Sequence, residues 1–237
     1  MEFHANEGKN VIREVHGHRY ARHAITTHFV KSGESYVDLV KKYVVPVYQE
    51  GDIVSASEKV IAICQGRLVY KKDLKVGALA KFLSHFAGRT EQGAGAGCVW
   101  KMQFAIDLHG PFKVIWAAIC GGFGKLVGKH GVFYTMLGRE VSGMDGFLPE
   151  ESFEEYGDYG IRVPEDPTGV CNKVYAETGV KLMIIDANDI NREILAHCDA
   201  ITNPVSELVD MIDDNPAGQE KELTPFILIR DVTNAEA

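Results

Sequence analysis

The hydrophobic residues in the first third of the chain follow two patterns, helical spacing and short continuous runs. Between residues 32 and 44 they recur every three to four positions, which predicts a helix that Ser32 or Ser35 caps. A continuous run at 53–56 predicts a strand, and the spacing at 76–87 predicts a second helix.

Apolar runs in the middle of the chain predict further strands. These runs cover residues 112–120 and 132–137. The acidic, aromatic stretch 142–162 predicts a long loop, whose exposed aromatic side chains would serve a subunit interface or a substrate lid. The aromatic residues expected to be exposed there are Phe147, Phe153, Tyr156 and Tyr159.

The last third of the chain carries clear start and stop signals. Pro167 suits the first turn of a helix, and Gly179 ends that helix. The run 180–186 predicts a buried strand that closes on an acid, and 224–232 predicts a final strand. Residues 192–213 look helical, with a break at an Asn-Pro pair.

Helices and strands mix along the chain without strict strand–helix alternation. This order favours an α+β fold, with mixed sheets and packed helices, over a doubly wound sheet. We expect one unit over residues 1–237, with a polar N-terminal segment at 1–20 and a tail at 233–237.

Composition narrows the classes of partner. The net charge is −8 and the pI about 5.6, so we expect no nucleic acid and no anionic membrane, both of which need a basic face. An acidic protein that binds a polyphosphate usually needs a divalent metal ion to bridge the like charges.

The cysteines and the N-terminal residues indicate a cytoplasmic protein. The five cysteines are odd in number and form no CxxC pair, which fits a reducing compartment and argues against disulfides or a zinc knuckle. The first residues lack the apolar core of a signal peptide, and no apolar run reaches the length of a membrane span. His16 and His18 form a His-x-His pair that can bind zinc, but a solvated segment is the favoured interpretation.

Two glycine-rich stretches fail as nucleotide motifs. The stretch GAGAGC at 93–98 lacks the last glycine of a dinucleotide fingerprint and has no strand before it. The stretch GKLVGKH at 124–130 has His130 where a P-loop has Ser or Thr. We interpret both as turns.

Charged and oxygen-bearing residues at predicted strand ends are the better candidates for a site. Ser57, Glu58 and Lys59 interrupt two apolar runs, where a core strand would not place charges. Carboxylates and amides are the ligands that Mg²⁺ prefers. The candidates of this kind are Asp145, Asp186, Asp189 and Gln219. Taken singly, each is also compatible with a helix cap, a loop or a solvated side chain.

The order of five loose motifs resembles the coenzyme F420-0:gamma-glutamyl ligase family. After Ser32-Gly-Glu the chain reads EGDIVSASEKVIAICQGRLV, then KHGVFYTMLGREVSGMDG, then VPEDPTGVCNKVYAETGVKLMIID, and finally NPAGQEKELTPFILIRD. The resemblance covers about residues 24–70 and 129–232; residues 1–20 and 71–128 match poorly.

The resemblance implies a fold of two intimately joined sub-domains, a homodimer, and a ligase that uses GTP with Mg²⁺ or Mn²⁺ to join an amino acid such as glutamate to a small-molecule carboxylate. By position, the implied metal ligands are Asp145, Asp186, Gln219 and Asp189. The implied nucleotide-binding residues are Thr27, His28, Phe29, Val30, Glu58, Lys59, Gly218 and Gln219. The implied catalytic residues are Asp145, Asp186 and Lys59, with Arg192 a further contact to acceptor or phosphate.

Departures from the family leave the substrates open. Gly146-Phe147 stands where the family has Ser-Asn, and DANDINRE replaces its Asp-Thr and Gly-Arg pairs. Metal and phosphate features are therefore better preserved than substrate features. This favours a relative with an altered acceptor, and the alternative is a non-catalytic nucleotide- or ligand-binding relative.

Overall fold

The computed structural model describes residues 2–87, 95–147, 153–187, 192–218 and 222–234. The chain folds into two compact units: unit 1 comprises Met1–Gly66 and Pro164–Ala237, and unit 2 comprises Arg67–Val163. The fold is α+β, as the sequence predicts, with a mixed sheet and packed helices. That the two units work as one ligase-like unit stays a prediction.

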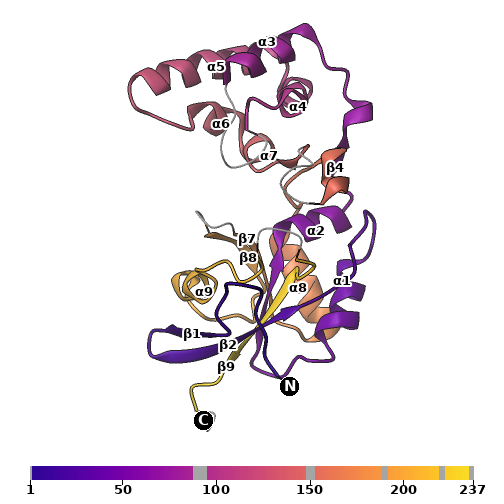
Figure 1. Cartoon of the computed structure of the whole chain (residues 1–237), viewed down its shortest axis with the longest axis vertical. Coiled ribbons are helices and arrows are strands. Elements are labelled where there is room, and N and C mark those ends of the chain that lie inside the picture. Colours follow the sequence, from indigo (N-terminus) through magenta and orange to yellow (C-terminus); the bar gives the residue numbers. More distant parts are fainter. Residues whose placement is uncertain (1, 88–94, 148–152, 188–191, 219–221, 235–237) are drawn as a thin grey trace. The chain divides into compact units, whose positions relative to one another are not determined.

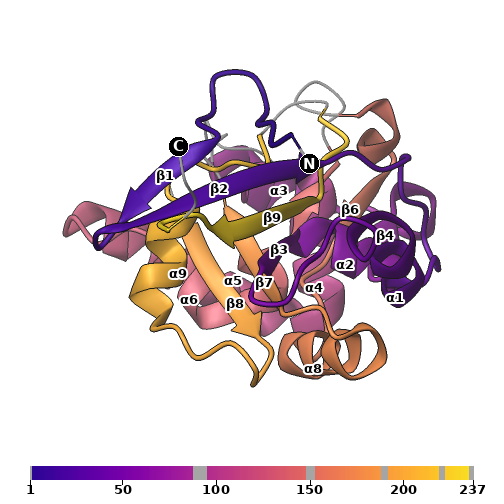
Figure 2. The same cartoon turned by 90° about the horizontal axis from the view of Figure 1, so that it is seen from below.

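Unit 1, drawn in Figure 1, is built on a six-stranded sheet with the order β1-β2-β9-β3-β7-β8, whose strands are all labelled in Figure 2. Its strands are β1 (Ile12–Val15), β2 (His18–Ile25), β3 (Ile53–Ser57), β7 (Leu182–Ala187), β8 (Arg192–His197) and β9 (Phe226–Asp231). Strands β3 and β7 are parallel, and the other neighbouring pairs are antiparallel. The first four residues of each of the strands β3, β7 and β9 are buried, so the core of unit 1 lies at the centre of the sheet.

The described residues of unit 1 also form four helical segments. They are α1 (Tyr36–Leu39), which continues into the π-helical turn η1 (Val40–Val44), α2 (Glu58–Cys64), α8 (Pro167–Thr178) and α9 (Val205–Met211). Helix α8 packs against β7 and β8, and α1 lies beside it (Figure 2). Helix α9 contacts both β1 and β8, the two outermost strands, so the sheet curls around it.

Several predicted elements of unit 1 are confirmed. Ser35 caps α1, because its hydroxyl oxygen accepts the N–H of Asp38 at 3.2 Å. Pro167 occupies the first turn of α8, and Gly179 follows its end with a positive φ of 75°. The predicted strand at 180–186 is β7.

Unit 2 consists of a small sheet and a cluster of helices. The strands β4 (Leu68–Tyr70), β6 (Tyr159–Ile161) and β5 (Asp145–Gly146) pair in that order, with short 3-10 turns at η2 (Lys71–Asp73) and η3 (Glu154–Gly157). The helices are α3 (Ala78–Ala87), α4 (Val99–His109), α5 (Pro111–Leu126), α6 (Val132–Leu137) and α7 (Arg139–Ser142). Met102 and Ala105 of α4 are buried against Ala80, Val114 and Leu137 from the neighbouring helices.

The strands predicted at 112–120 and 132–137 are wrong, because these residues form α5 and α6. A continuous apolar run favours a strand only if all of its residues are buried. In α5 only one helical face is buried, which includes Val114 and Ala117, while large apolar residues on the other face are exposed. Pro111 begins this helix directly after Gly110, whose φ is 80°.

Two further expectations are corrected. Residues 192–197 form β8, which pairs antiparallel with β7, and the predicted helix is limited to α9. The stretch 142–162 contains β5, η3 and β6, and its aromatic residues are not exposed. Phe147 and Tyr156 are buried, whereas Phe153 and Tyr159 are half-buried.

The histidine-rich N-terminal segment forms part of the sheet of unit 1. Residues 12–25 make the β1–β2 hairpin, with His16 and His18 exposed at its turn. These two histidines face different aspartates, Asp210 and Asp231, at 3.2 and 3.1 Å. Among the described residues, no helix combines the length and apolar character needed to span a membrane.

Candidate functional site

Four chain segments meet at one end of the sheet of unit 1. Ser57, the last residue of β3, is in register with Ile185 of the parallel strand β7. On the other side of β3, Phe226 at the start of β9 pairs with both Ala56 and Ile25. The ends of β2, β3 and β7 and the start of β9 therefore lie side by side, and we call this region the strand-end site (Figures 1 and 2).

Backbone hydrogen bonds fix the loops of the strand-end site. The N–H of Thr27, beyond the end of β2, donates to the carbonyl oxygen of Leu223 at 2.7 Å. The N–H of Ser57 donates to the carbonyl oxygen of Pro225 at 2.9 Å. The segment that precedes β9 is thus held against the ends of both β2 and β3.

The strand-end site brings together predicted residues that are far apart in the sequence. Glu58 and Lys59 open α2 directly after β3, with Glu58 buried and Lys59 half-buried. Asp186 is half-buried near the end of β7, one residue beyond the partner of Ser57. Thr27 and Val30 are buried, Phe29 is half-buried and His28 is exposed.

Gly218 lies in a tight turn that leads towards the strand-end site. Its φ is 79°, in the left-handed region that favours glycine, and the closest contacts of an added Cβ atom would be with the movable end of the Glu222 side chain. The turn is closed by Asn215, whose carbonyl oxygen accepts the N–H of Gly218 at 3.1 Å. Thr224 fastens the segment, since its hydroxyl donates to the carbonyl oxygen of Ala217 at 3.2 Å.

The remaining predicted metal ligands are not part of the described strand-end site. Asp145 belongs to unit 2, where it is exposed on β5. Gln219 and Asp189 lie outside the described residues. Within the described residues of the chain, no three His, Cys, Asp or Glu side chains are grouped so that they could hold a metal ion. The convergence of residues 145, 186 and 219 therefore stays a prediction.

A three-residue network extends from the loop after β2. His28 contacts Tyr43 through Nδ1 and Glu34 through Nε2, both at 2.7 Å. The hydrogen bonds to Tyr43 and Glu34 raise the pKa of His28 above its ordinary value. The same contact with His28, together with one to Lys42, lowers the pKa of Tyr43 to about 8. The network therefore ties the protonation of His28 to the hydrogen bonds that it makes with Tyr43 and Glu34.

We expect His28 and His23 to titrate on opposite sides of the ordinary histidine pKa. Burial lowers the pKa of His23, with the neighbouring His4 adding to the effect, whereas hydrogen bonding raises the pKa of His28. NMR titration of the histidine side chains measures both. Replacing Tyr43 with Phe is expected to lower the pKa of His28 and to leave that of His23 unchanged. A His28 that titrates below His23 would contradict the network.

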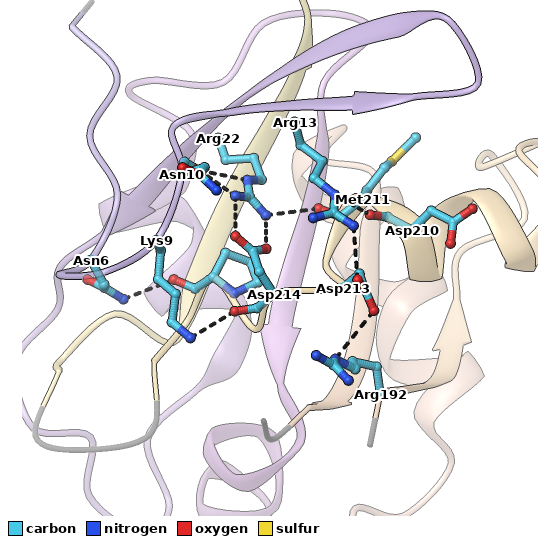
Figure 3. Close-up of polar contacts among 11 residues, drawn as sticks. Asn6, Lys9, Asn10, Arg13, Arg22, Arg192, Asp210, Met211, Asp213 and Asp214 are labelled. Atoms are coloured by element: carbon cyan, nitrogen blue, oxygen red, sulfur yellow. Dashed lines mark hydrogen bonds and ion pairs between the residues drawn. The ribbon is translucent and has the colours of Figure 1, made fainter. Parts of the chain in front are cut away.

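Arg192, predicted to contact acceptor or phosphate, lies in a polar cluster beside α9 (Figure 3). Its Nε lies 3.6 Å from Asp213 Oδ1, and Arg13 NH2 lies 3.0 Å from Oδ2 of the same carboxylate. Sequence reasoning missed the centre of this cluster, Arg22, whose guanidinium is buried and pairs with Asp214. The sequence signal for the burial of Arg22 is its position two residues after Tyr20, because residues two apart in a strand lie on the same face.

Unit 2 places a second residue that sequence reasoning missed near a predicted metal ligand. Lys101 of α4 is buried, and its Nζ donates to the carbonyl oxygens of Met144 at 2.7 Å and Ser142 at 3.3 Å. Burial lowers the pKa of Lys101 to about 8, although the charge of Asp145 acts in the opposite direction. A lysine inside the apolar stretch 99–105 is the only sequence signal for it.

Comparison with known proteins does not assign this chain to a family. No family model matches the chain, and no match is found among curated proteins. The structure therefore defines an α+β protein with a strand-end site, and the resemblance to the ligase family rests on the order of the motifs.

Proposed function

We propose that this protein is a nucleotide- and divalent-metal-dependent ligase that joins a carboxylate to an amine. The resemblance in motif order points to GTP, to a small-molecule carboxylate and to an amino acid such as glutamate. The observation that carries the proposal is the strand-end site, where Thr27, Lys59 and Asp186, which are far apart in the sequence, lie at the ends of β2, β3 and β7.

The proposed roles follow from the chemistry of these side chains. Lys59 is a compact cation at a strand end, suited to neutralise a phosphate oxygen. The segment 27–30 would line the nucleotide, and the glycine at 218 permits close approach of the backbone to a phosphate.

The donors at the strand-end site are of the type that a hard cation requires. Asp186 and the neighbouring Glu58 are carboxylates, and Mg²⁺ or Mn²⁺ bind through one or two carboxylates together with substrate phosphates. Bound there, the metal ion would neutralise phosphate charge. Asp145, Gln219 and Asp189 are the further ligands that we propose by resemblance.

The proposed reaction proceeds in two steps. The acceptor carboxylate oxygen takes the γ-phosphoryl group, which leaves a nucleoside diphosphate and an acyl phosphate. The amine then attacks the acyl carbon, an amide bond forms, and inorganic phosphate leaves with the loss of one amine proton. Such transfers depend mainly on positioning and charge neutralisation, which rigid strand ends supply.

Titration calorimetry with GTP or ATP and Mg²⁺ tests the nucleotide site. We expect binding to require the metal ion and Lys59→Met to weaken it by about 10-fold or more, since hydrogen bonds to charged groups contribute about 1.5–3 kcal/mol. Lys173→Met, at an exposed lysine of α8 in the same unit, is the matched control and should bind normally. Absence of binding by either nucleotide would refute the proposal.

Phosphate release with candidate carboxylates and amino acids then tests turnover. Release that requires both an acceptor and an amine is the expected result. If the nucleotide binds with the metal ion but no acceptor supports turnover, the protein is instead a non-catalytic, nucleotide-binding relative. The altered substrate segments around Phe147 and Asp186 are compatible with that alternative.

A further inference from the structure

Unit 2 exposes an apolar surface on two contacting helices. We call it the α3–α5 surface; α3 and α5 contact each other, and both pack against α4. Its exposed large apolar side chains are Phe82, Phe86, Phe112, Trp116, Ile119, Phe123, Leu126 and Val127. In the described part of unit 1, the exposed large apolar residues are scattered over separate elements. The concentration of exposed apolar side chains on α3 and α5 is therefore a local feature.

The exposed residues of α5 form one continuous stripe. Phe112, Trp116, Ile119, Phe123 and Leu126 are separated by alternating steps of four and three, which places them on one side of a helix. The opposite side of α5 is anchored by the buried Val114 and Ala117. Phe112 is 84% exposed and Trp116 60% exposed, so the outward stripe has the character of a binding face.

The two sequence segments that contain α3 and α5 are basic, whereas the rest of the chain is acidic. From Leu108 to Arg139 the sequence has four basic residues, Lys113, Lys125, Lys129 and Arg139, and neither aspartate nor glutamate. The stretch 74–87, which contains α3, also lacks acids and carries Lys75 and Lys81. The net charge of −8 therefore arises entirely outside these two segments.

We infer that the α3–α5 surface binds the face of an anionic lipid bilayer. Aromatic and aliphatic side chains of such a helix insert at the headgroup boundary, while flanking lysines contact lipid phosphates. Trp116 and Phe123 occupy the apolar stripe, and Lys113 and Lys125 are exposed at other positions around the same helix. The expectation of no membrane partner rested on the charge of the whole chain, which conceals this local excess of lysine.

A second copy of the chain suits this surface less well than a bilayer does. Joining two α3–α5 surfaces would bring together two sets of lysines, Lys113, Lys125 and Lys129, without an acid in the segment to neutralise them. Like charges at a desolvated contact are unfavourable. An anionic bilayer neutralises the same lysines and buries the same apolar stripe.

Flotation of the full chain with vesicles tests this inference. Vesicles that contain phosphatidylglycerol are expected to bind the protein about 10-fold or more tightly than vesicles of phosphatidylcholine alone, with release by salt. The double variant Trp116→Ser and Phe123→Ser should lose this binding by at least about 10-fold, because it removes the inserted side chains. Val45→Ser with Val205→Ser, at exposed valines of unit 1, is the matched control and should bind as the unaltered protein does.

A spectroscopic measurement places the contact at the helix. The chain has two tryptophans, so Trp100→Phe leaves Trp116 as the sole reporter, whose emission should shift to shorter wavelength with anionic vesicles. No flotation with either vesicle, or no change at Trp116, would overturn the inference. A dimer that the double variant dissociates, without vesicle binding, would assign the surface to a second copy instead.

Discussion

Asp186→Asn is expected to reduce nucleotide-dependent amide formation by at least about 100-fold while the protein stays folded. The proposed function makes Asp186 one of the residues that would hold the metal ion at the strand-end site, and loss of its carboxylate would weaken binding of the ion that would neutralise phosphate charge. The amide keeps the size of the side chain, and Asp186 is only half-buried near the end of β7, where it pairs with Glu193 of β8. Stability should therefore change little.

Phosphate release measured over a range of Mg²⁺ concentrations, with a thermal melt of the same samples, checks this expectation. Asp210→Asn is the matched control, because Asp210 is another half-buried aspartate of unit 1, on α9 beside His16. It should retain normal turnover. Near-normal metal-dependent turnover by Asp186→Asn would remove this residue from the site, whereas lost turnover accompanied by a lower melting temperature would indicate a structural role.

The elements of unit 1 that the sequence predicts correctly carry local signals at both ends. Helix α8 has Pro167 in its first turn and Gly179 at its end, and β7 is a uniformly apolar run that stops at an acid. Helix α5 has a comparable start at Pro111, but its apolar residues lie on both faces, so periodicity gave no helix. Prediction from a hydrophobic pattern assumes that apolar residues are buried. The exposed apolar residues of the α3–α5 surface do not meet this assumption.

Which residues make up the strand-end site depends on the pairing of strands that are far apart in the sequence. A local sequence pattern does not predict such pairing. Motif order points to Lys59 and Asp186 as separate candidates, but their proximity follows from the parallel pairing of β3 with β7. Strand β9, from the end of the chain, then separates β3 from β2 and brings Thr27 to the same end. The burial of Lys101 could not be predicted from the sequence either, because only the packing of α4 shows it.

Arg22→Met is expected to lower the free energy of unfolding by about 3–5 kcal/mol, the usual cost of removing one partner of a buried ion pair. The Arg22 side chain is 1% exposed on β2. Its guanidinium pairs with both oxygens of Asp214, with 2.7 Å from NH2 to Oδ2, and donates to the carbonyl oxygens of Asn10 and Met211 (Figure 3). Methionine fills similar volume but removes the guanidinium that donates to this carboxylate and to these carbonyl oxygens.

The same pair predicts how the loss depends on pH. Burial favours the neutral form of Asp214, but hydrogen bonds and charge from Arg22 outweigh it and hold the pKa of Asp214 below its ordinary value. The stability due to this shift is complete above the unfolded-state pKa of the carboxyl group and is lost as the pH falls through the lower folded-state pKa. The difference in stability between the unaltered protein and Arg22→Met should therefore be largest at neutral pH and shrink in acid.

Urea unfolding of the full chain at neutral and acidic pH measures both effects. Arg13→Met is the matched control, because Arg13 pairs with Asp213 at 3.0 Å in the same cluster but is 29% exposed, and its loss should cost no more than about 1 kcal/mol. Adding Asp214→Asn to Arg22→Met should recover part of the loss, since it removes the unpaired charge. Equal stability losses for the two arginine variants would mean that the buried pair does not anchor α9 and the segment after it to the β1–β2 hairpin.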